Sequence, residues 1–203
     1  MSQHSQLEIT AIVPAAGMST RMGNRNKLLM DYKGKSLIEH AVDTLLGSEV
    51  SNVIVVLGFE AEEVRAKVGR KPVRLVLNPD YRDGMSSSIK AGVGALPPET
   101  DAIMIYLADQ PLMTPAEVNQ IVAAFQTAMF SGKTIVVPFH KGQRGNPVVM
   151  DASFKDAILD VAGDVGCRKV IKRNPDRVFA LEMETDHVVR DIDRMEDYAA
   201  LGL

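Results

Sequence analysis

The sequence predicts a single-domain α/β fold in which a mostly parallel mixed sheet carries helices on both faces. Short apolar runs rich in β-branched residues alternate with longer stretches of helical period, the pattern of successive strand–helix–strand units. Turn signals such as Asn78-Pro79-Asp80 separate these runs. The length of 203 residues suits one domain with its own core. We therefore expect a flexible N-terminal tail over residues 1–8 and one domain over residues 9–203.

The individual elements follow from local patterns. Continuous apolar or β-branched runs predict strands over residues 9–14, 53–57, 73–77, 102–107, 134–138, 147–150, 177–181 and 187–190. Apolar residues spaced three and four apart predict helices over residues 36–46, 60–68, 86–96, 114–129, 154–161 and 167–173, with a short one near the C-terminus.

Two of these helices carry strong start signals. Ser36 with Glu39 three positions later is a capping-box pattern, as is Thr114 with Glu117. Pro115 occupies the first helical position of the second case, where its missing N–H costs nothing. These signals fix the two N-terminal boundaries.

Composition excludes several classes of protein. The net charge of −3 gives no global attraction to nucleic acid, so any anion binding must be local. The single cysteine, Cys167, forms no internal disulfide, which agrees with a reducing compartment and a cytoplasmic location. No stretch approaches the roughly 20 apolar residues of a membrane helix. A small phosphorylated ligand is the partner that these features favour.

The loop after the first strand is the most informative segment. It runs Ala15-Ala16-Gly17-Met18-Ser19-Thr20-Arg21-Met22-Gly23, with Lys27 four residues later. Small residues let backbone N–H groups approach an oxygen ligand, and the two cations supply charge for phosphates. Neither a P-loop nor G-x-G-x-x-G is present. The loop predicts a phosphate cradle; the simpler alternative is a surface turn whose Arg21 and Lys27 are solvated.

Carboxylates at two places are candidate metal ligands. Asp109 ends an apolar strand, where a buried carboxylate needs water or a cation, and Mg²⁺ suits a strand-end Asp beside a triphosphate. The alternative is a solvated turn before Pro111. Near the C-terminus Asp191 and Asp193 follow, and Asp193 fits equally well as N-cap of the last helix with Glu196. Asp191 is therefore the preferred second ligand.

Five segments in series resemble one enzyme family. They are the loop described above, Gly84-Met85-Ser86-Ser87-Ser88-Ile89, Asp109-Gln110-Pro111, Arg144-Gly145-Asn146-Pro147-Val148, and Asp191-Ile192-Asp193 before Glu196-Asp197-Tyr198. Together they are similar to the MobA-like nucleotidyltransferases, and most similar to the molybdenum cofactor cytidylyltransferases. The resemblance implies a Rossmann-like nucleotidyltransferase fold whose sheet includes an antiparallel strand.

The resemblance also implies roles for individual residues. Catalytic roles fall to Arg21, Lys27 and Asp109, and the metal ligands are Asp109 and Asp191. The nucleotide-binding residues are Ala15, Ala16, Gly17, Met18, Ser19, Arg21, Lys27, Gly84, Ser87 and Ser88. The acceptor-binding residues are Arg144, Gly145, Asn146 and Arg168, from two loops that mix glycine with cations.

The implied activity is transfer of CMP from CTP to the terminal phosphate of molybdopterin, with Mg²⁺, or alternatively Mn²⁺, as cofactor. Cytosine is favoured because guanylyl relatives tend to have glycine where this chain has Ala16. Three alternatives stay open: a guanylyltransferase using GTP, a cytidylyltransferase acting on a sugar or polyol phosphate, and a non-catalytic carrier of the molybdenum cofactor. The implied partners are these small molecules and, transiently, a recipient molybdoenzyme.

Overall fold

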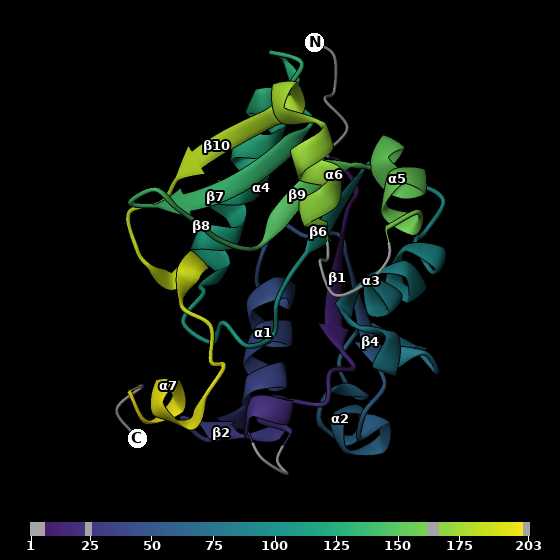
Figure 1. The fold of residues 1–203 in the computed structure, drawn as a ribbon, viewed down its shortest axis with the longest axis vertical. Coiled ribbons are helices and arrows are strands. Elements are labelled where there is room, and N and C mark those ends of the chain that lie inside the picture. The colour runs from purple at the N-terminus through teal and green to yellow at the C-terminus, as the bar shows by residue number, and fades with distance from the viewer. Residues whose placement is uncertain (1–6, 23–25, 162–166, 201–203) are drawn as a thin grey trace.

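The computed structural model describes residues 7–22, 26–161 and 167–200, apart from the Arg21 side chain. Within these residues the main sheet has eight strands in the order β10-β7-β9-β6-β1-β4-β5, with β8 paired to β7 (Figure 1). Its strands are β1 (Ile9–Ala15), β4 (Asn52–Leu57), β5 (Arg74–Leu77), β6 (Ala102–Ile105), β7 (Ile135–His140), β8 (Gln143–Arg144), β9 (Val148–Asp151) and β10 (Val178–Glu182). A separate two-stranded ribbon pairs β2 (Asp31–Tyr32) with β3 (Lys35–Ser36).

Strand directions make the sheet mostly parallel. The central strand β1 runs parallel to β4 and to β6, and β5 continues the parallel half beside β4. Strand β9 lies antiparallel between β6 and β7, while β10 is parallel to β7. The expected antiparallel member is thus β9. Because β1 and β6 are parallel neighbours, the loops that follow them leave from the same edge of the sheet.

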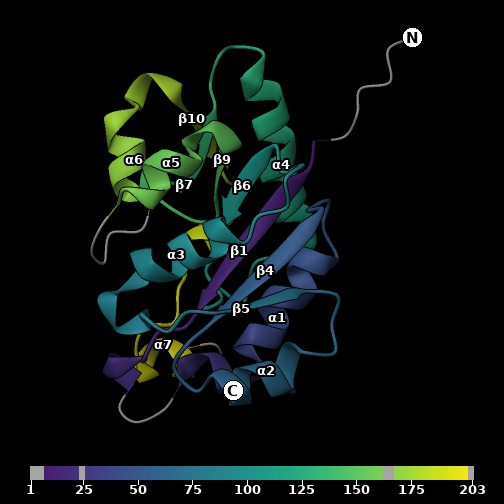
Figure 2. The ribbon, with the colours of Figure 1, turned by 90° about the vertical axis from the view of Figure 1, so that its right-hand side faces the viewer.

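Helices cover both faces of this sheet, as expected (Figure 2). One layer contains α1 (Leu37–Leu46), α2 (Ala61–Val68) and α4 (Pro115–Met129), and the other contains α3 (Met85–Gly94), α5 (Lys155–Leu159) and α6 (Arg168–Arg173). Alternation along β1 serves the two layers, since Ala11 and Val13 join the first core cluster and Ile12 joins the second. The short α7 (Met195–Ala199) lies beyond these layers near the C-terminus.

Both predicted capping boxes are present. Ser36 precedes α1 and its backbone N–H donates to the Glu39 carboxylate at 2.9 Å. Thr114 precedes α4, donates from its backbone N–H to Glu117 at 2.8 Å, and accepts the Glu117 N–H at 3.3 Å. Reciprocal bonds of this kind satisfy backbone donors that a helix leaves open.

The predicted strand over residues 187–190 is wrong. The chain forms a 3-10 turn there, η6 (His187–Val189), and Val188 is fully buried. The Val188 carbonyl accepts hydrogen bonds from the Asn146 backbone and the Gln110 side chain. The β-branched Val188 and Val189 suggested a strand because such residues are common in buried strands. The segment is instead held by individual hydrogen bonds and not by a strand ladder.

Only the last two residues of the expected N-terminal tail, Leu7 and Glu8, are described by the structure. Residues 1–6 lie outside the described residues, whereas Leu7 packs against the core and the Glu8 N–H donates to Asp101 at 2.9 Å. Among the helices that the structure describes, none has both the length and the apolar character needed to cross a bilayer.

Candidate active site

The loop after β1 folds so that the Ser19 side chain contacts the backbone of Lys27. Ser19 has a left-handed backbone conformation, with φ of 50°, and its carbonyl closes the 3-10 turn η1 (Thr20–Met22). Its hydroxyl accepts the backbone N–H of Lys27 at 3.1 Å. Arg21 lies within η1, but its side chain and Gly23 lie outside the described residues. The loop therefore places Lys27 at the edge of the sheet where Asp109 follows β6.

Lys27 is held by three oxygen atoms. Its Nζ donates to Asp109 Oδ2 at 2.6 Å, to the Ile192 carbonyl at 3.0 Å and to Asp193 Oδ1 at 3.1 Å. Burial by itself lowers the pKa of Lys27, but the charges and hydrogen bonds of the two carboxylates outweigh it and raise that pKa. Lys27 is therefore a fixed cation at neutral pH.

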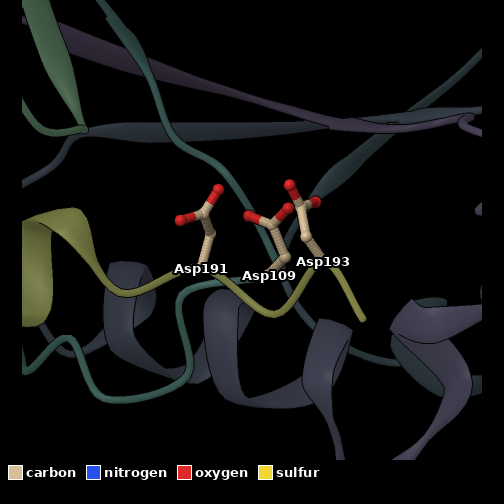
Figure 3. A group of neighbouring side chains, drawn as sticks. All are labelled: Asp109, Asp191 and Asp193. Carbon is tan, nitrogen blue, oxygen red and sulfur yellow. The ribbon is translucent and has the colours of Figure 1, made fainter. Parts of the chain in front are cut away.

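Three carboxylates gather around this lysine. Asp109, Asp191 and Asp193 each offer one oxygen, and these oxygens lie within 4.8 Å of one another. Figure 3 shows the side chains projecting from two segments, Asp109 from one and the C-terminal pair from the other. Burial, followed by the charges of Asp109 and Asp193, raises the pKa of Asp191. One lysine opposes three nearby carboxylates, so the group attracts a further cation.

The donor set fits a hard divalent cation. Mg²⁺ and Mn²⁺ prefer carboxylate oxygens, and all three ligands here are carboxylates. Asp109 Oδ1 is buried and has no hydrogen-bond partner among the described residues, which is costly for a carboxylate unless an ion or water meets it. Both C-terminal aspartates belong to the group, so Asp193 is a candidate ligand beside the predicted Asp191.

The alternative role of Asp193, as N-cap of the last helix, is wrong. Helix α7 begins at Met195, and its N-cap position is Arg194. The Asp197 carboxylate accepts the backbone N–H groups of Asp193 at 3.0 Å and Arg194 at 2.7 Å. A residue inside the helix thus closes its start, and the Asp193 carboxylate is available to Lys27.

A cleft of about 480 Å³ opens beside the carboxylates. Its walls come from the loop after β1, the start of α3 and the segment after β6. They include Gly17, Met18, Ser19, Thr20, Lys27, Gly84, Met85, Ser88 and Asp109. Most of the nucleotide-binding residues named above therefore line one cavity. Tyr81, Arg82 and Asp83 line it too, and the sequence analysis did not name them. The signal that could have found them is their position directly before Gly84, which was named.

Three predicted nucleotide-binding residues lie elsewhere. Ala15 and Ala16 are buried, and a Cβ on Gly58 would come 2.5 Å from the Ala16 Cβ, so the Ala16 methyl group packs toward Gly58. Ser87 donates to the Gly84 carbonyl at 2.8 Å and lines a neighbouring cavity. Of the cleft residues, Gly84 has φ of 95°, which favours glycine at the start of α3.

The predicted acceptor residues form a second basic region. Arg144 lies on β8 and Arg168 is the first residue of α6, while residues 163–166 of the same predicted loop lie outside the described residues. Burial, and then repulsion from Arg168, lowers the pKa of Arg144. The Arg144 Nε is buried without a hydrogen-bond partner in the described part of the chain. Two guanidinium groups close enough to repel each other attract an anion.

Fold and site together define an α/β protein with a cleft beside a group of three carboxylates. Residues 11–178 match the MobA-like NTP transferase domain, and the chain belongs to that family. The family confirms the resemblance inferred from the five segments, and nucleotidyl transfer is its class of chemistry.

Individual relatives cover nearly the whole chain. "Nicotine blue oxidoreductase" of Paenarthrobacter nicotinovorans is 31% identical over 192 residues, covering 93% of both chains. "Molybdenum cofactor cytidylyltransferase" of Escherichia coli (strain K12) is 22% identical over 191 residues, covering 94% of this chain and 93% of the relative. These two names describe different reactions, so the substrate is not fixed by similarity.

The fold is shared with Rv0371c of Mycobacterium tuberculosis H37Rv. Its crystal structure superposes with a TM-score of 0.84 at 23% identity, covering 97% of this chain and 98% of that one. A complex of the same protein with manganese gives a TM-score of 0.79. The single-domain α/β architecture is therefore established.

Proposed function

We propose that this protein is a cytidylyltransferase that joins CMP from CTP to the terminal phosphate of molybdopterin, with or without bound molybdenum, and releases pyrophosphate. The observation that carries the proposal is the convergence of Lys27, Asp109 and the 480 Å³ cleft at one edge of the sheet. The cytidylyltransferase relative of Escherichia coli supports the choice of nucleotide and acceptor.

The reaction needs little proton transfer. An oxygen of the acceptor phosphate, already an anion, attacks the α-phosphorus of CTP, the bond to the bridging oxygen breaks, and pyrophosphate leaves. The protein therefore acts by positioning and by charge stabilisation. The loop from Gly17 to Thr20 and the start of α3 at Gly84 bind the nucleotide in the cleft. Lys27, and Arg21 from the same loop, stabilise the negative charge that accumulates on the phosphates.

Asp109, Asp191 and Asp193 would hold Mg²⁺ or Mn²⁺, whose positive charge reduces the repulsion between the two reacting anions. The manganese complex of Rv0371c supports this assignment. The Arg144 and Arg168 guanidinium groups bind an anionic part of the acceptor, and Gly145 and Asn146 shape the loop beside them.

The test is pyrophosphate release from each of the four nucleoside triphosphates, with molybdopterin as acceptor and Mg²⁺ or Mn²⁺ present. CTP is expected to support the fastest release. Asp109→Asn is expected to lower turnover at least about 100-fold, because a metal ligand contributes several kcal/mol to such reactions. The exposed Glu99→Gln is the matched control and is expected to match the wild type.

Each alternative gives a different result in this assay. Faster release from GTP identifies a guanylyltransferase, and release only with a sugar or polyol phosphate identifies a different acceptor. Tight binding of the dinucleotide product without any turnover identifies a carrier. Full activity of Asp109→Asn contradicts the proposed site itself.

The relative of Paenarthrobacter nicotinovorans favours a second candidate, an oxidoreductase that acts on nicotine blue. Oxidation of NADH or NADPH that depends on nicotine blue, without pyrophosphate release from any triphosphate, selects this candidate. The acidic group around Lys27 favours the transferase, because it matches the needs of a polyphosphate with its metal ion.

A further inference from the structure

The C-terminal aspartates reach the site on a segment outside the sheet. Asp191 and Asp193 flank Ile192, and the chain from Arg190 to Arg194 belongs to no helix or strand. Their distance from Asp109 therefore depends on whatever fixes this segment against the turn after β6. Metal ligands need such support, because affinity depends on ligand geometry as well as on ligand number.

Two hydrogen bonds join this segment to the turn that carries Asp109. The Ile192 N–H donates to the Asp109 carbonyl at 2.9 Å. Four residues earlier, the Val188 carbonyl accepts from Gln110 Nε2, also at 2.9 Å. Asp109 and Gln110, which are adjacent, thus bind both ends of the stretch from Val188 to Ile192, which contains Asp191. Asp193 directly follows Ile192.

Gln110 is an unusual residue for its environment. The exposed fraction of Gln110 is 2%, and its hydrogen-bond partner, Val188, is fully buried. The amide oxygen Oε1 is buried and has no hydrogen-bond partner within the described residues. Burying an amide with only part of its hydrogen-bonding capacity satisfied is unfavourable for stability, so an apolar side chain of similar size would suit the fold better.

The Val188 carbonyl also contacts the predicted acceptor loop. The Asn146 N–H donates to it at 2.9 Å, and a Cβ on Gly145 would lie 2.5 Å from the same oxygen. One carbonyl therefore receives donors from the turn of Asp109 and from the loop of Arg144. The Val188 carbonyl therefore links the turn that carries Asp109 to the predicted acceptor loop.

We propose that Gln110 is a positioning residue, which uses its bond to the Val188 carbonyl to hold Asp191 and Asp193 at metal-binding distance from Asp109. The inference rests on the metal site of the proposed function. Gln110 is not among the residues that line the cleft, and it acts through the segment that carries two of the carboxylates.

The experiment compares Mn²⁺ binding, measured by electron paramagnetic resonance, in the full chain and its variants. Gln110→Met removes the donor while keeping the size of the side chain, and it is expected to weaken Mn²⁺ binding about tenfold. Its melting temperature is expected to equal or exceed that of the wild type, since a half-satisfied buried amide is removed. A merely structural role predicts the opposite pair of results, a lower melting temperature with unchanged Mn²⁺ affinity.

Gln110→Glu sharpens the test. It retains the shape of glutamine, but an ionised carboxylate cannot donate to the Val188 carbonyl. Charge alone predicts tighter Mn²⁺ binding, because a fourth carboxylate is added near the site, whereas loss of positioning predicts weaker binding. Thr44→Val is the matched control, because it removes another side-chain bond to a backbone carbonyl, that of Met113, away from the C-terminal segment.

Hydrogen exchange supplies a readout independent of metal. Faster exchange of the Ile192 and Asn146 amides in Gln110→Met, but not in Thr44→Val, supports the proposal, and unchanged exchange overturns it. Wild-type Mn²⁺ affinity in Gln110→Met also overturns it. If Asp109→Asn loses Mn²⁺ binding in the same experiment, the metal site of the proposed function still stands. Failure of the wild type to bind Mn²⁺ contradicts the metal site of the proposed function, and the exchange data then test only whether Gln110 fixes the C-terminal segment.

Discussion

Replacing Lys27 with methionine tests the charge arrangement most directly. Lys27 contacts two carboxylates at 2.6 and 3.1 Å, with 17% of its side chain exposed. The pairs are neither fully buried nor fully solvated, so we expect a loss of about 1–2 kcal/mol in the free energy of unfolding, between the values for surface and buried pairs. The net charge of the group becomes more negative, so Mn²⁺ is expected to bind the nucleotide-free variant more tightly.

Catalysis is expected to suffer far more than binding. A cation that faces the charge of a transition state contributes about 10²–10³-fold to turnover when it is removed singly. The dissociation constant of CTP is expected to change little, because the remaining loop and α3 contacts bind the ground state equally well. Lys35→Met is the control, since Lys35 forms a 2.7 Å pair with Asp43 but is 53% exposed outside the cleft.

Steady-state pyrophosphate release gives turnover, and calorimetry gives the CTP dissociation constant. A turnover of Lys27→Met within threefold of Lys35→Met would refute the reasoning. An equal loss in turnover and in CTP affinity would also do so, because it would make Lys27 a uniform binding residue.

Three further predictions concern stability. Gly92→Ala would place a Cβ 2.4 Å from a β1 side chain and should destabilise the protein by about 1–3 kcal/mol. Gly94→Ala on the same helix meets nothing within 4 Å and should stabilise it by about 0.5–1 kcal/mol; equal urea midpoints for the two variants would contradict the packing. Gly145→Ala would bring its Cβ 2.5 Å from the Val188 carbonyl, so both the melting temperature and the Mn²⁺ affinity should fall, and an unchanged Mn²⁺ affinity would separate that carbonyl from the metal site. Burial opposes ionisation of Glu117, but the hydrogen bonds it accepts lower its pKa below 4.5, so its stabilisation is complete above that pH and is lost as pH falls through the folded-state value. Urea midpoints of Glu117→Gln should thus fall less than those of wild type on acidification, and parallel curves would show otherwise.

Local signals carried most of the sequence prediction. The capping boxes at Ser36 and Thr114 set helix boundaries because they involve residues only three positions apart. The small-residue loop and Asp109 lie at one edge because β1 and β6 are parallel neighbours, whose carboxyl ends point the same way. Such features depend on short stretches and on one topological rule.

Features set by distant contacts escaped prediction. Val188 has strand propensity, yet its carbonyl is bound by Gln110, 78 positions away, and by Asn146 of the predicted acceptor loop. The spacing of Asp193 fits a local cap, but the Asp197 carboxylate accepts the N–H groups at the helix start. The Asp193 carboxylate instead accepts a hydrogen bond from Lys27, 166 positions away. No residue spacing reveals such pairings, because only the folded chain brings the partners together.

The antiparallel strand β9 divides the sheet in a way that bears on evolution. Strands β5, β4, β1 and β6 form the parallel half of the sheet, while β7, β10 and β8, which carries Arg144, lie on the other side of β9. Insertions or replacements in this outer part leave the register of the parallel half untouched. Under the proposed function, a change of acceptor would therefore fall in the outer part, and the parallel half beside the cleft would keep its geometry.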